Sequence, residues 1–398
     1  MTRCVGYLVQ ESNFIVEHVN LKHLIYLNNA ASTWPKPACV LNAVAQAASL
    51  PYLESGRTTL EGLVSYPDEG REALSSFFHS GDPSEWVFTS NATDSLNILI
   101  HGFAASHDSP FHVITTEFEH NAVIRPLLSL KKAGKISLTI VPADSCGNIS
   151  PDSIAEAITP ETRLGVINHG NNVTGAVQDI RAISRVLHED GVFSIFDGSQ
   201  TAGQIPISLS DTSADAFVFT GHKYLFGTPG IGGFFLRTPE PVLPLKQGGT
   251  GFDSASPDHP GEMPVRFEAG TPNFPGIAAL TAGIRYLSDT GFDQIPSHLA
   301  EMSRYLSGRL SDLDAVTLYN PDPDTPILSF NVSGTDPEDI GLVLGRRYQV
   351  ITRTGLHCAP WIHQRLTNGL GCVRMSLSYL NTMDQCRIVG DIIEELVA

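Results

Sequence analysis

Short runs rich in β-branched and aromatic residues alternate with amphipathic stretches of helical spacing from about residue 24 to residue 237. This alternation is typical of a mostly parallel sheet whose strands are joined by covering helices. Two of the expected helices cover 151–158, with Ser150 as N-cap and Pro151 in the first turn, and 179–189. The seven expected strands cover 86–89, 112–116, 137–141, 163–168, 193–196, 216–220 and 232–236.

The pattern changes after a polar, proline-rich segment at 252–265, which we interpret as the junction between two domains. Strand-like runs at 327–332, 348–352 and 373–378 are interleaved with helical segments. One of these segments repeats apolar residues at steps of three and four, as on one face of a helix: Leu299, Met302, Leu306, Leu310 and Leu313. We therefore expect a large α/β domain over 24–265 and a smaller α+β domain formed by 1–23 and 266–398.

Composition and charge narrow the function classes. The chain has 398 residues, of which 42% are hydrophobic, so it can bury large cores. Its 25 basic and 42 acidic residues give a net charge of −17, a field that repels nucleic-acid phosphates and anionic lipid headgroups. No uncharged apolar run reaches the roughly 18 residues of a membrane helix, and residues 1–20 lack the apolar core of a signal peptide. We expect a cytoplasmic protein that binds neither nucleic acid nor a membrane.

The six cysteines are far apart, with neither a C-x-x-C pair nor the spacing of a zinc site, so we expect reduced thiols and no metal. Cys358 stands out because it lies in the turn-rich segment RTGLHCAP, which predicts an exposed thiol. Arg353 and His357 in this segment could favour its thiolate. His363 follows nearby, but the further ligands that zinc needs are not evident in the spacing. Cys372 and Cys386 fall in a strand pattern and a helix pattern and are predicted to be buried.

The seven lysines can be sorted by their surroundings. Lys223 follows the predicted strand 216–220 and precedes GTPGIGG at 227–233, which places it at the edge of the sheet where ligands bind in open α/β folds. A partly desolvated lysine there could act as a nucleophilic amine toward an aldehyde such as pyridoxal phosphate, although a lone lysine at a strand end is usually only solvated. We interpret four others as solvated surface charges: Lys36, Lys131, Lys132 and Lys135.

Polar residues at four other strand ends support a cofactor site. Asp197 could keep a pyridine nitrogen protonated, and helix capping is the alternative explanation. Ala92 and Thr93 open a helix, where free backbone N–H groups suit a phosphate, although capping would explain Thr93 equally well. His120 could stack on a flat ring, and Asn172 adds an amide. Together with the lysine, these groups predict a pyridoxal phosphate site.

These segments resemble the class V aminotransferase group of fold-type I pyridoxal phosphate enzymes, and within it the cysteine desulfurase and selenocysteine lyase family. The Arg-Thr-Gly-x-His-Cys loop is similar to that of the second group of this family. The resemblance implies a homodimer in which a large, mostly parallel seven-stranded sheet domain carries the cofactor and a smaller α+β domain carries the cysteine loop. It covers nearly the whole chain, including FTSNATDSLN (88–97), EFEHNAV (117–123), DGSQTAG (197–203), FTGHKYLFGTPGIGG (219–233), RFEAGTPN (266–273) and VRMSLSYLNT (373–382).

The resemblance also implies roles for single residues. Lys223 would bind the cofactor covalently, His120 would stack on its ring, and Asp197 would pair with its nitrogen. Cys358 would accept the sulfur, and Arg374 would pair with the substrate carboxylate. The other implied contacts are Ala92, Thr93, Thr220 and His222 to the phosphate, Asn172 and Gln200 to the phenolic oxygen or the substrate, and Thr271 across a dimer interface.

One segment departs from the family pattern. Members commonly show Arg-Gly-x-His in this region, where our chain keeps Arg57, a candidate substrate contact, but has Leu60 in place of the histidine. The departure leaves the substrate preference open.

The implied function is desulfuration of L-cysteine to L-alanine, with the sulfur held as a persulfide on Cys358. An acceptor protein or a small thiol would then take this sulfur, for example for iron–sulfur cluster assembly. The enzymatic alternatives are a selenocysteine lyase acting on L-selenocysteine, another class V aminotransferase, an epimerase and a C–S β-lyase. A scaffold without turnover is a further alternative, which the intact Lys223, Asp197, His120 and Cys358 argue against.

Overall fold

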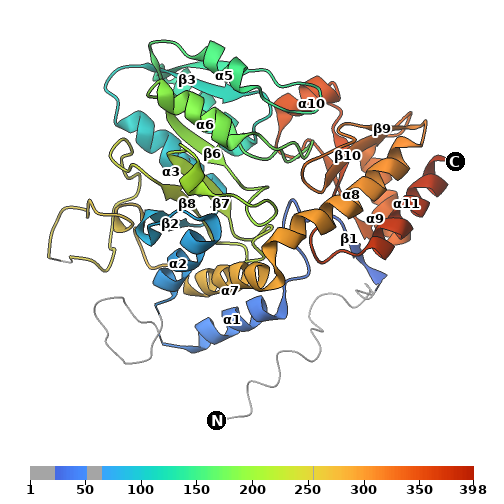
Figure 1. Cartoon of the computed structure of the whole chain (residues 1–398), viewed down its shortest axis with the longest axis horizontal. Coiled ribbons are helices and arrows are strands. Elements are labelled where there is room, and N and C mark those ends of the chain that lie inside the picture. Colours follow the sequence, from blue (N-terminus) through green and yellow to red (C-terminus); the bar gives the residue numbers. More distant parts are fainter. Residues whose placement is uncertain (1–22, 52–64, 254) are drawn as a thin grey trace, which may run out of the picture.

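The computed structural model describes residues 23–51, 65–253 and 255–398 (Figure 1). Arg57, Leu60 and residues 1–22 lie outside the described residues. The described chain contains a large sheet flanked by helices and, beside it, a smaller sheet covered by the C-terminal helices (Figure 1).

The large sheet has seven strands in the order β2-β8-β7-β6-β5-β3-β4. All neighbours pair in parallel except β8, which is antiparallel to β2 and β7. No helix lies between β7 and β8, and without a long crossover the chain returns in the antiparallel direction. All seven predicted strands are confirmed. Their bounds are β2 Trp86–Thr89, β3 Phe111–Thr116, β4 Ile136–Val141, β5 Thr162–Asn168, β6 Phe193–Asp197, β7 Ala216–Thr220 and β8 Gly232–Leu236.

Helices cover both faces of this sheet. Phe217 and Phe219 of β7 belong to one apolar cluster with residues of α6 and α7, whereas Val218 belongs to a second cluster with residues of α3 and α4. Burial on both faces explains why the strands read as nearly continuous apolar runs. The helices around the large sheet are α1 Ala38–Ser49, α2 Tyr66–Phe78, α3 Ala92–Ala105, α4 Asn121–Lys132, α5 Pro151–Ala157, α6 Ile180–Glu189 and α7 Phe274–Thr290.

The smaller sheet has four strands in the order β12-β13-β10-β9, all antiparallel. A separate parallel pair joins β1 to β11. The strands are β1 Ile25–Tyr26, β9 Val316–Leu318, β10 Ile327–Val332, β11 Val350–Ile351, β12 Arg353–Gly355 and β13 Cys372–Ser376. The helices are α8 Ile295–Ser311, α9 Pro337–Tyr348, α10 Pro360–Leu366 and α11 Met383–Val397. Short 3-10 helices occur at η2 Pro83–Glu85, η3 Leu209–Asp211, η4 Val265–Phe267 and η5 Phe292–Gln294.

Two predictions for this region need correction. Tyr348 ends α9, and Gln349 adopts the left-handed conformation at φ 54°, so the strand predicted at 348–352 is reduced to β11. The apolar stripe of α8 is confirmed through Leu310, but the helix stops at Ser311 and leaves Leu313 outside it. Both errors concern helix ends, where one left-handed or capping residue changes the chain direction.

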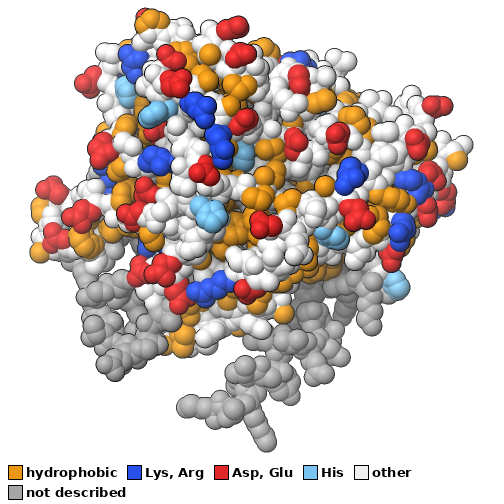
Figure 2. Space-filling model, in the orientation of Figure 1, with side chains coloured by type: hydrophobic (Ala, Val, Ile, Leu, Met, Phe, Trp, Pro, Cys, Tyr) orange, Lys and Arg blue, Asp and Glu red, His pale blue; other side chains and the backbone are white. Residues whose placement is uncertain are grey.

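The surface on the face shown in Figure 2 carries interspersed acidic and basic side chains. None of the helices in the described ranges is long and apolar enough to cross a membrane.

Candidate active site

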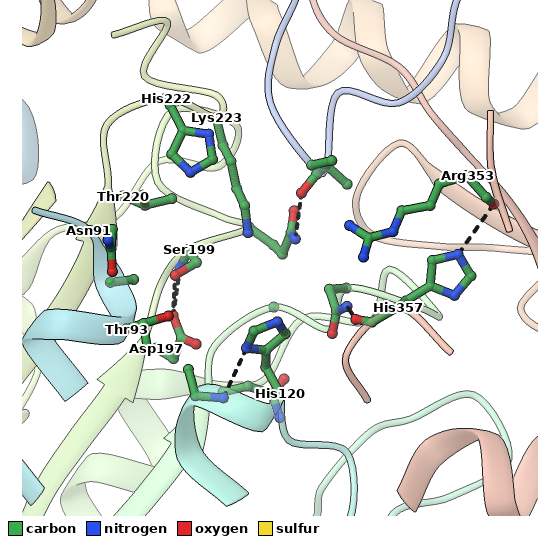
Figure 3. Close-up of a pocket in the computed structure, with 18 of the residues that line it drawn as sticks. Asn91, Thr93, His120, Asp197, Ser199, Thr220, His222, Lys223, Arg353 and His357 are labelled. Carbon is green, nitrogen blue, oxygen red and sulfur yellow. Dashed lines mark hydrogen bonds between the residues drawn. The ribbon is translucent and has the colours of Figure 1, made fainter. Parts of the chain in front are cut away.

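A cavity of about 550 Å³ lies at the carboxyl ends of the central strands, and residues of the smaller sheet and the adjoining loop line its other side (Figure 3). Figure 3 shows Lys223 reaching into this space between Asn91 and Thr93 on one side and Arg353 and His357 on the other. The fold therefore brings together nearly all of the candidate site residues from distant segments. Those that line the cavity are Ala92, Thr93, His120, Asn172, Asp197, Gln200, Thr220, His222, Lys223 and Arg374.

Lys223 lies in the turn that follows β7. Gly227 N–H donates to Gly221 O at 2.8 Å and closes this turn, where a Cβ on Gly221 would lie 2.8 Å from Ile231 Cγ2. Burial lowers the pKa of Lys223 to about 8, against the opposing effect of the Asp197 carboxylate. The neutral, nucleophilic form of this amine is therefore much more populated near physiological pH than that of an ordinary lysine.

Asp197 ends β6 and faces the same cavity. Its Oδ1 accepts hydrogen bonds from the N–H of Ser199 at 3.0 Å and from Ser199 Oγ at 2.5 Å. Residues 199–204 form turns and no helix, so the helix N-cap alternative for Asp197 is wrong. Gly198 is required here because a Cβ would lie 2.0 Å from Phe217 Cζ. The carboxylate is thus held at the strand end by a tight turn.

His120 caps the N-terminus of α4. Its Nδ1 accepts a hydrogen bond from Ala122 N–H at 3.1 Å, so the neutral ring carries its proton on Nε2. Burial, together with the charge of Lys223, lowers the pKa of His120 to about 4. The ring is therefore neutral and fixed in orientation, as stacking on a flat cofactor would require.

The N-terminus of α3 and the turn after β7 form the end of the cavity opposite the smaller sheet. Asn91 is the N-cap of α3 and accepts from Asp94 N–H at 3.0 Å, so Thr93 is not the capping residue. Two buried polar atoms, Thr220 Oγ1 and His222 Nδ1, have no hydrogen-bond partner among the described residues. Free helical N–H groups beside unpaired polar atoms suit a phosphate group.

Lys36 lies behind this end of the cavity, and its surroundings differ from the predicted solvent-exposed ones. Its Nζ donates to Thr33 Oγ1 at 2.7 Å and to His222 O at 2.8 Å, and burial lowers its pKa to about 7. It is therefore not a solvated surface charge. Flanking prolines in the sequence suggested an exposed turn, but the segment packs against the turn that carries His222.

The smaller sheet contributes two guanidinium groups. Arg374 is buried, and its Nη1 donates to Asn172 O at 2.8 Å. Burial and the nearby charge of Arg353 lower the pKa of Arg374 to about 10, which still leaves it charged at neutral pH. Its Nε is buried without a partner among the described residues. Two cations beside an unpaired donor make this end of the cavity suited to a carboxylate.

Cys358 is exposed beside the cavity, as predicted. It and His357 both adopt left-handed backbone conformations, with φ 58° and φ 50°, which are uncommon for residues other than glycine. Arg353 Nη2 lies 3.8 Å from Cys358 Sγ. Burial lowers the pKa of His357 to about 2, so this ring is neutral and adds no positive charge. Of these two neighbours of Cys358, only Arg353 therefore brings a positive charge near Sγ.

Two candidate residues lie elsewhere. Thr271 lines a second cavity, of about 170 Å³, together with Lys246 and Asn273. Arg57 falls outside the described residues.

Some residues of the cavity wall were missed by the sequence reasoning. Ser199 follows Asp197 by two residues, a spacing typical of Asx turns that could have identified it. Arg353 was considered only as a neighbour of Cys358, but it also lines the cavity. The family resemblance also covers the segment YLNNAAST (26–33), but no role was predicted for Ala30 and Ala31, which reach the cavity from this segment.

Comparison with known proteins relates the whole chain to one family. The aminotransferase class-V family model matches residues 25–389. A probable cysteine desulfurase of Methanothermobacter thermautotrophicus is 31% identical over 388 residues, which cover 94% of this chain and 95% of the relative. A cysteine desulfurase of Klebsiella pneumoniae subsp. pneumoniae is 30% identical over 394 residues, covering 97% and 96%. The apo structure of a cysteine desulfurase from Thermococcus onnurineus superposes with a TM-score of 0.86 at 26% identity, covering 94% and 95%.

Proposed function

The chain belongs to the class V aminotransferase family, and on this premise we propose that it is a cysteine desulfurase that converts L-cysteine to L-alanine. The observation that carries the proposal is the convergence of Lys223, Asp197 and Arg374 on one cavity, with the exposed thiol of Cys358 beside it. A buried amine and carboxylate suit the cofactor of this family, the arginine suits an amino acid substrate, and the thiol suits sulfur transfer.

The cofactor is pyridoxal phosphate. The cavity fits it because three buried polar atoms that line it lack partners among the described residues: Gln200 Oε1, Thr220 Oγ1 and His222 Nδ1. In our assignment Lys223 holds the aldehyde carbon, His120 stacks on the ring, and Asp197 pairs with the ring nitrogen. Gln200 and Asn172 face the phenolic oxygen or the substrate. The phosphate is assigned to Ala92, Thr93, Thr220 and His222.

The residues around the substrate have distinct tasks. Bound pyridoxal phosphate supplies an electron sink that stabilises negative charge at the substrate Cα. Arg374 binds the substrate carboxylate and thereby orients the Cα–H bond. Lys223, whose pKa is lowered to about 8, takes the Cα proton as a general base.

Cys358 then accepts the sulfur. Its thiolate attacks the sulfur of L-cysteine, so that an S–S bond forms and the substrate Cβ–S bond breaks. The electron pair of the broken bond stays on Cβ, which takes up a proton, and protonated Lys223 returns a proton to Cα to give L-alanine. The terminal sulfur keeps its hydrogen, and Cys358 is left as a persulfide. Arg353, with Nη2 at 3.8 Å from Sγ, supports the attacking thiolate.

The proposal also covers the oligomeric state, the domain boundaries and the sulfur acceptor. We propose a homodimer in which Thr271, which lines the second cavity of its own chain, completes the phosphate site of the partner. The large domain over 24–265 and the smaller domain over 1–23 and 266–398 are proposed from the change of sequence pattern, with α7 packed against α1 and α2 of the large domain. The substrate contact of Arg57 is proposed on the family resemblance. An acceptor protein or a small thiol removes the persulfide sulfur.

The test is to measure alanine and sulfide formed from L-cysteine in the presence of a reductant. Cys358→Ala should keep the absorption of the bound cofactor but lose alanine formation, because the attacking thiol is gone. Cys39→Ala, which removes another exposed thiol, should match the parent. If Cys358→Ala formed alanine at the parental rate, the role of this cysteine would be refuted. Replacing L-cysteine by L-selenocysteine in both proteins tests the substrate preference.

A further inference from the structure

Three buried groups with metal-binding chemistry meet beside the cysteine loop, residues 353–360. His357 Nδ1, His363 Nε2 and Cys372 Sγ all lie within 4.8 Å of one another. They come from the loop itself, from α10 and from β13. The proposed desulfurase chemistry uses neither His363 nor Cys372, so this cluster requires a separate explanation.

Hydrogen bonds on the outer sides of the two rings determine where their protons lie. His357 Nε2 is 3.3 Å from Arg353 O, which can only accept, so Nε2 is the protonated nitrogen. Thr367 Oγ1 donates its one proton to His363 O at 2.9 Å and can only accept from His363 Nδ1, 3.4 Å away. Each neutral ring therefore turns its unprotonated nitrogen toward the other ring.

These two unprotonated nitrogens are 3.2 Å apart. Burial lowers the pKa of both His357 and His363, so both rings are neutral near pH 7. Two nitrogen lone pairs at hydrogen-bonding distance repel each other when no proton lies between them. A cation at this point would remove the repulsion and satisfy both rings.

The spacing of the three atoms suits a tetrahedral metal ion. With Zn–N bonds of about 2.0–2.1 Å and a Zn–S bond of about 2.3 Å, ideal tetrahedral angles place two nitrogens about 3.3 Å apart and a nitrogen and a sulfur about 3.6 Å apart. The corresponding distances here are 3.2 Å between the two nitrogens and 3.9 Å between His357 Nδ1 and Cys372 Sγ. The third pair, His363 Nε2 and Cys372 Sγ, lies within 4.8 Å, so Cys372 Sγ would move toward the two rings by at most about 1.2 Å to complete the geometry.

Charge decides which form of the cluster can bind a cation. Arg374 lies close enough to act on the pKa of both histidines and of Cys372, so positive charge is already present. A neutral thiol carries no negative charge to offset a second cation, whereas a thiolate does. Coordination to zinc deprotonates a thiol even where burial opposes ionisation. The cysteine is therefore the ligand on which binding should depend most strongly.

We propose that His357, His363 and Cys372 bind one transition-metal cation of the zinc class. The outer hydrogen bonds to Arg353 O and Thr367 Oγ1 orient the imidazoles, as the outer shells of known zinc sites do. The three protein ligands leave a fourth position for a small ligand such as water. The cation ties the backbone next to Cys358 to α10 and β13, and so holds the cysteine loop in its left-handed conformation. The site does not depend on the proposed activity.

The test uses Co²⁺ as a spectroscopic probe on the cofactor-loaded full chain. The background is Cys358→Ala, which removes the exposed thiol of the loop as a competing ligand. We expect one equivalent of Co²⁺ to bind, with the visible bands of tetrahedral cobalt and a thiolate-to-cobalt charge-transfer band. Zn²⁺ added in equal amount should displace the cobalt and abolish these bands.

Three further variants in this background identify the ligands. Cys372→Ser and His363→Gln should each weaken Co²⁺ binding by at least about tenfold, since even outer-shell changes cost that much. Cys386→Ser is the matched control, because Cys386 is also buried but lies in α11, and it should bind as the background protein does. Far-ultraviolet circular dichroism and the cofactor absorption show that each variant is folded.

Two results would overturn the proposal: absence of stoichiometric Co²⁺ binding in the Cys358→Ala protein, or equal binding by Cys372→Ser and Cys386→Ser. In the first case the tautomer assigned to one ring is also wrong, and its inner nitrogen is protonated and donates to the other ring. Because cobalt binding is read without turnover, failure of this site and failure of the desulfurase proposal are distinguishable.

Discussion

Lys223 and Lys36 show how surroundings separate two residues of one type. Burial lowers the pKa of both, to about 8 and about 7. Lys36 Nζ is held by Thr33 Oγ1 and His222 O, whereas Lys223 lines the cavity with the Asp197 carboxylate nearby. Lys36 therefore supports a turn, and Lys223 is free to react.

The reactivity of Lys223 should follow its lowered pKa. Trapping the product of apoprotein and pyridoxal phosphate with borohydride should give an adduct at Lys223, located by mass spectrometry. The rate of its formation should rise with pH and be half-maximal near pH 8, because the amine is protonated and unreactive below that value and neutral above it. In denaturant the half-maximal pH should move up toward the ordinary lysine value of 10.5. An adduct at another lysine would contradict the assignment of the site.

At the scale of single elements, the N-terminus of α6 contributes only to stability, whereas the N-terminus of α3 also faces the cavity. Asn91 caps α3 at the cavity, and Asp179 caps α6 away from it, accepting from Ala182 N–H at 2.9 Å. Both caps satisfy a backbone donor that the helix cannot satisfy itself. Only the first turn of α3 faces the proposed phosphate.

Asn91→Ala and Asp179→Ala should therefore lose similar amounts of stability but differ in their affinity for the cofactor. Each should lower the free energy of unfolding by about 1 kcal/mol, measured by urea denaturation of the apoproteins. Only Asn91→Ala should also raise the dissociation constant of pyridoxal phosphate, because α3 then presents a less ordered N-terminus to the phosphate. Equal cofactor affinity in the two variants would argue against the phosphate assignment.

At the scale of the whole molecule, the site forms where two sheets meet. Arg374 belongs to β13 of the smaller sheet, yet its Nη1 donates to Asn172 O in the loop after β5 of the large sheet. Asn172 Nδ2 in turn donates to His357 O at 2.8 Å, in the cysteine loop. These bonds link the substrate end of the cavity to the position of Cys358. A substitution at the substrate end should therefore also shift Cys358.

Arg374→Lys tests this arrangement. The ammonium group cannot make the paired hydrogen bonds of a guanidinium, and hydrogen bonds to charged groups contribute about 1.5–3 kcal/mol. We expect kcat/KM for L-cysteine to fall by about 10- to 100-fold, with cofactor absorption retained. Arg387→Lys, at an exposed pair with Asp384 on α11, is the control and should leave kcat/KM unchanged. A normal kcat/KM in Arg374→Lys would refute its role at the substrate carboxylate.

The sequence by itself determined the seven strands of the large sheet, the position of Lys223 after β7 and the exposure of Cys358, because these depend on local periodicity and on turn residues. Tertiary structure decided the burial of Lys36, the neutral state of His357 and the meeting of Cys372 with two histidines. These properties depend on which distant segments exclude water from a side chain and bring its partners within reach, and spacing along the chain does not encode them. A zinc-like spacing was absent from the sequence, yet the fold places three ligand atoms within 4.8 Å.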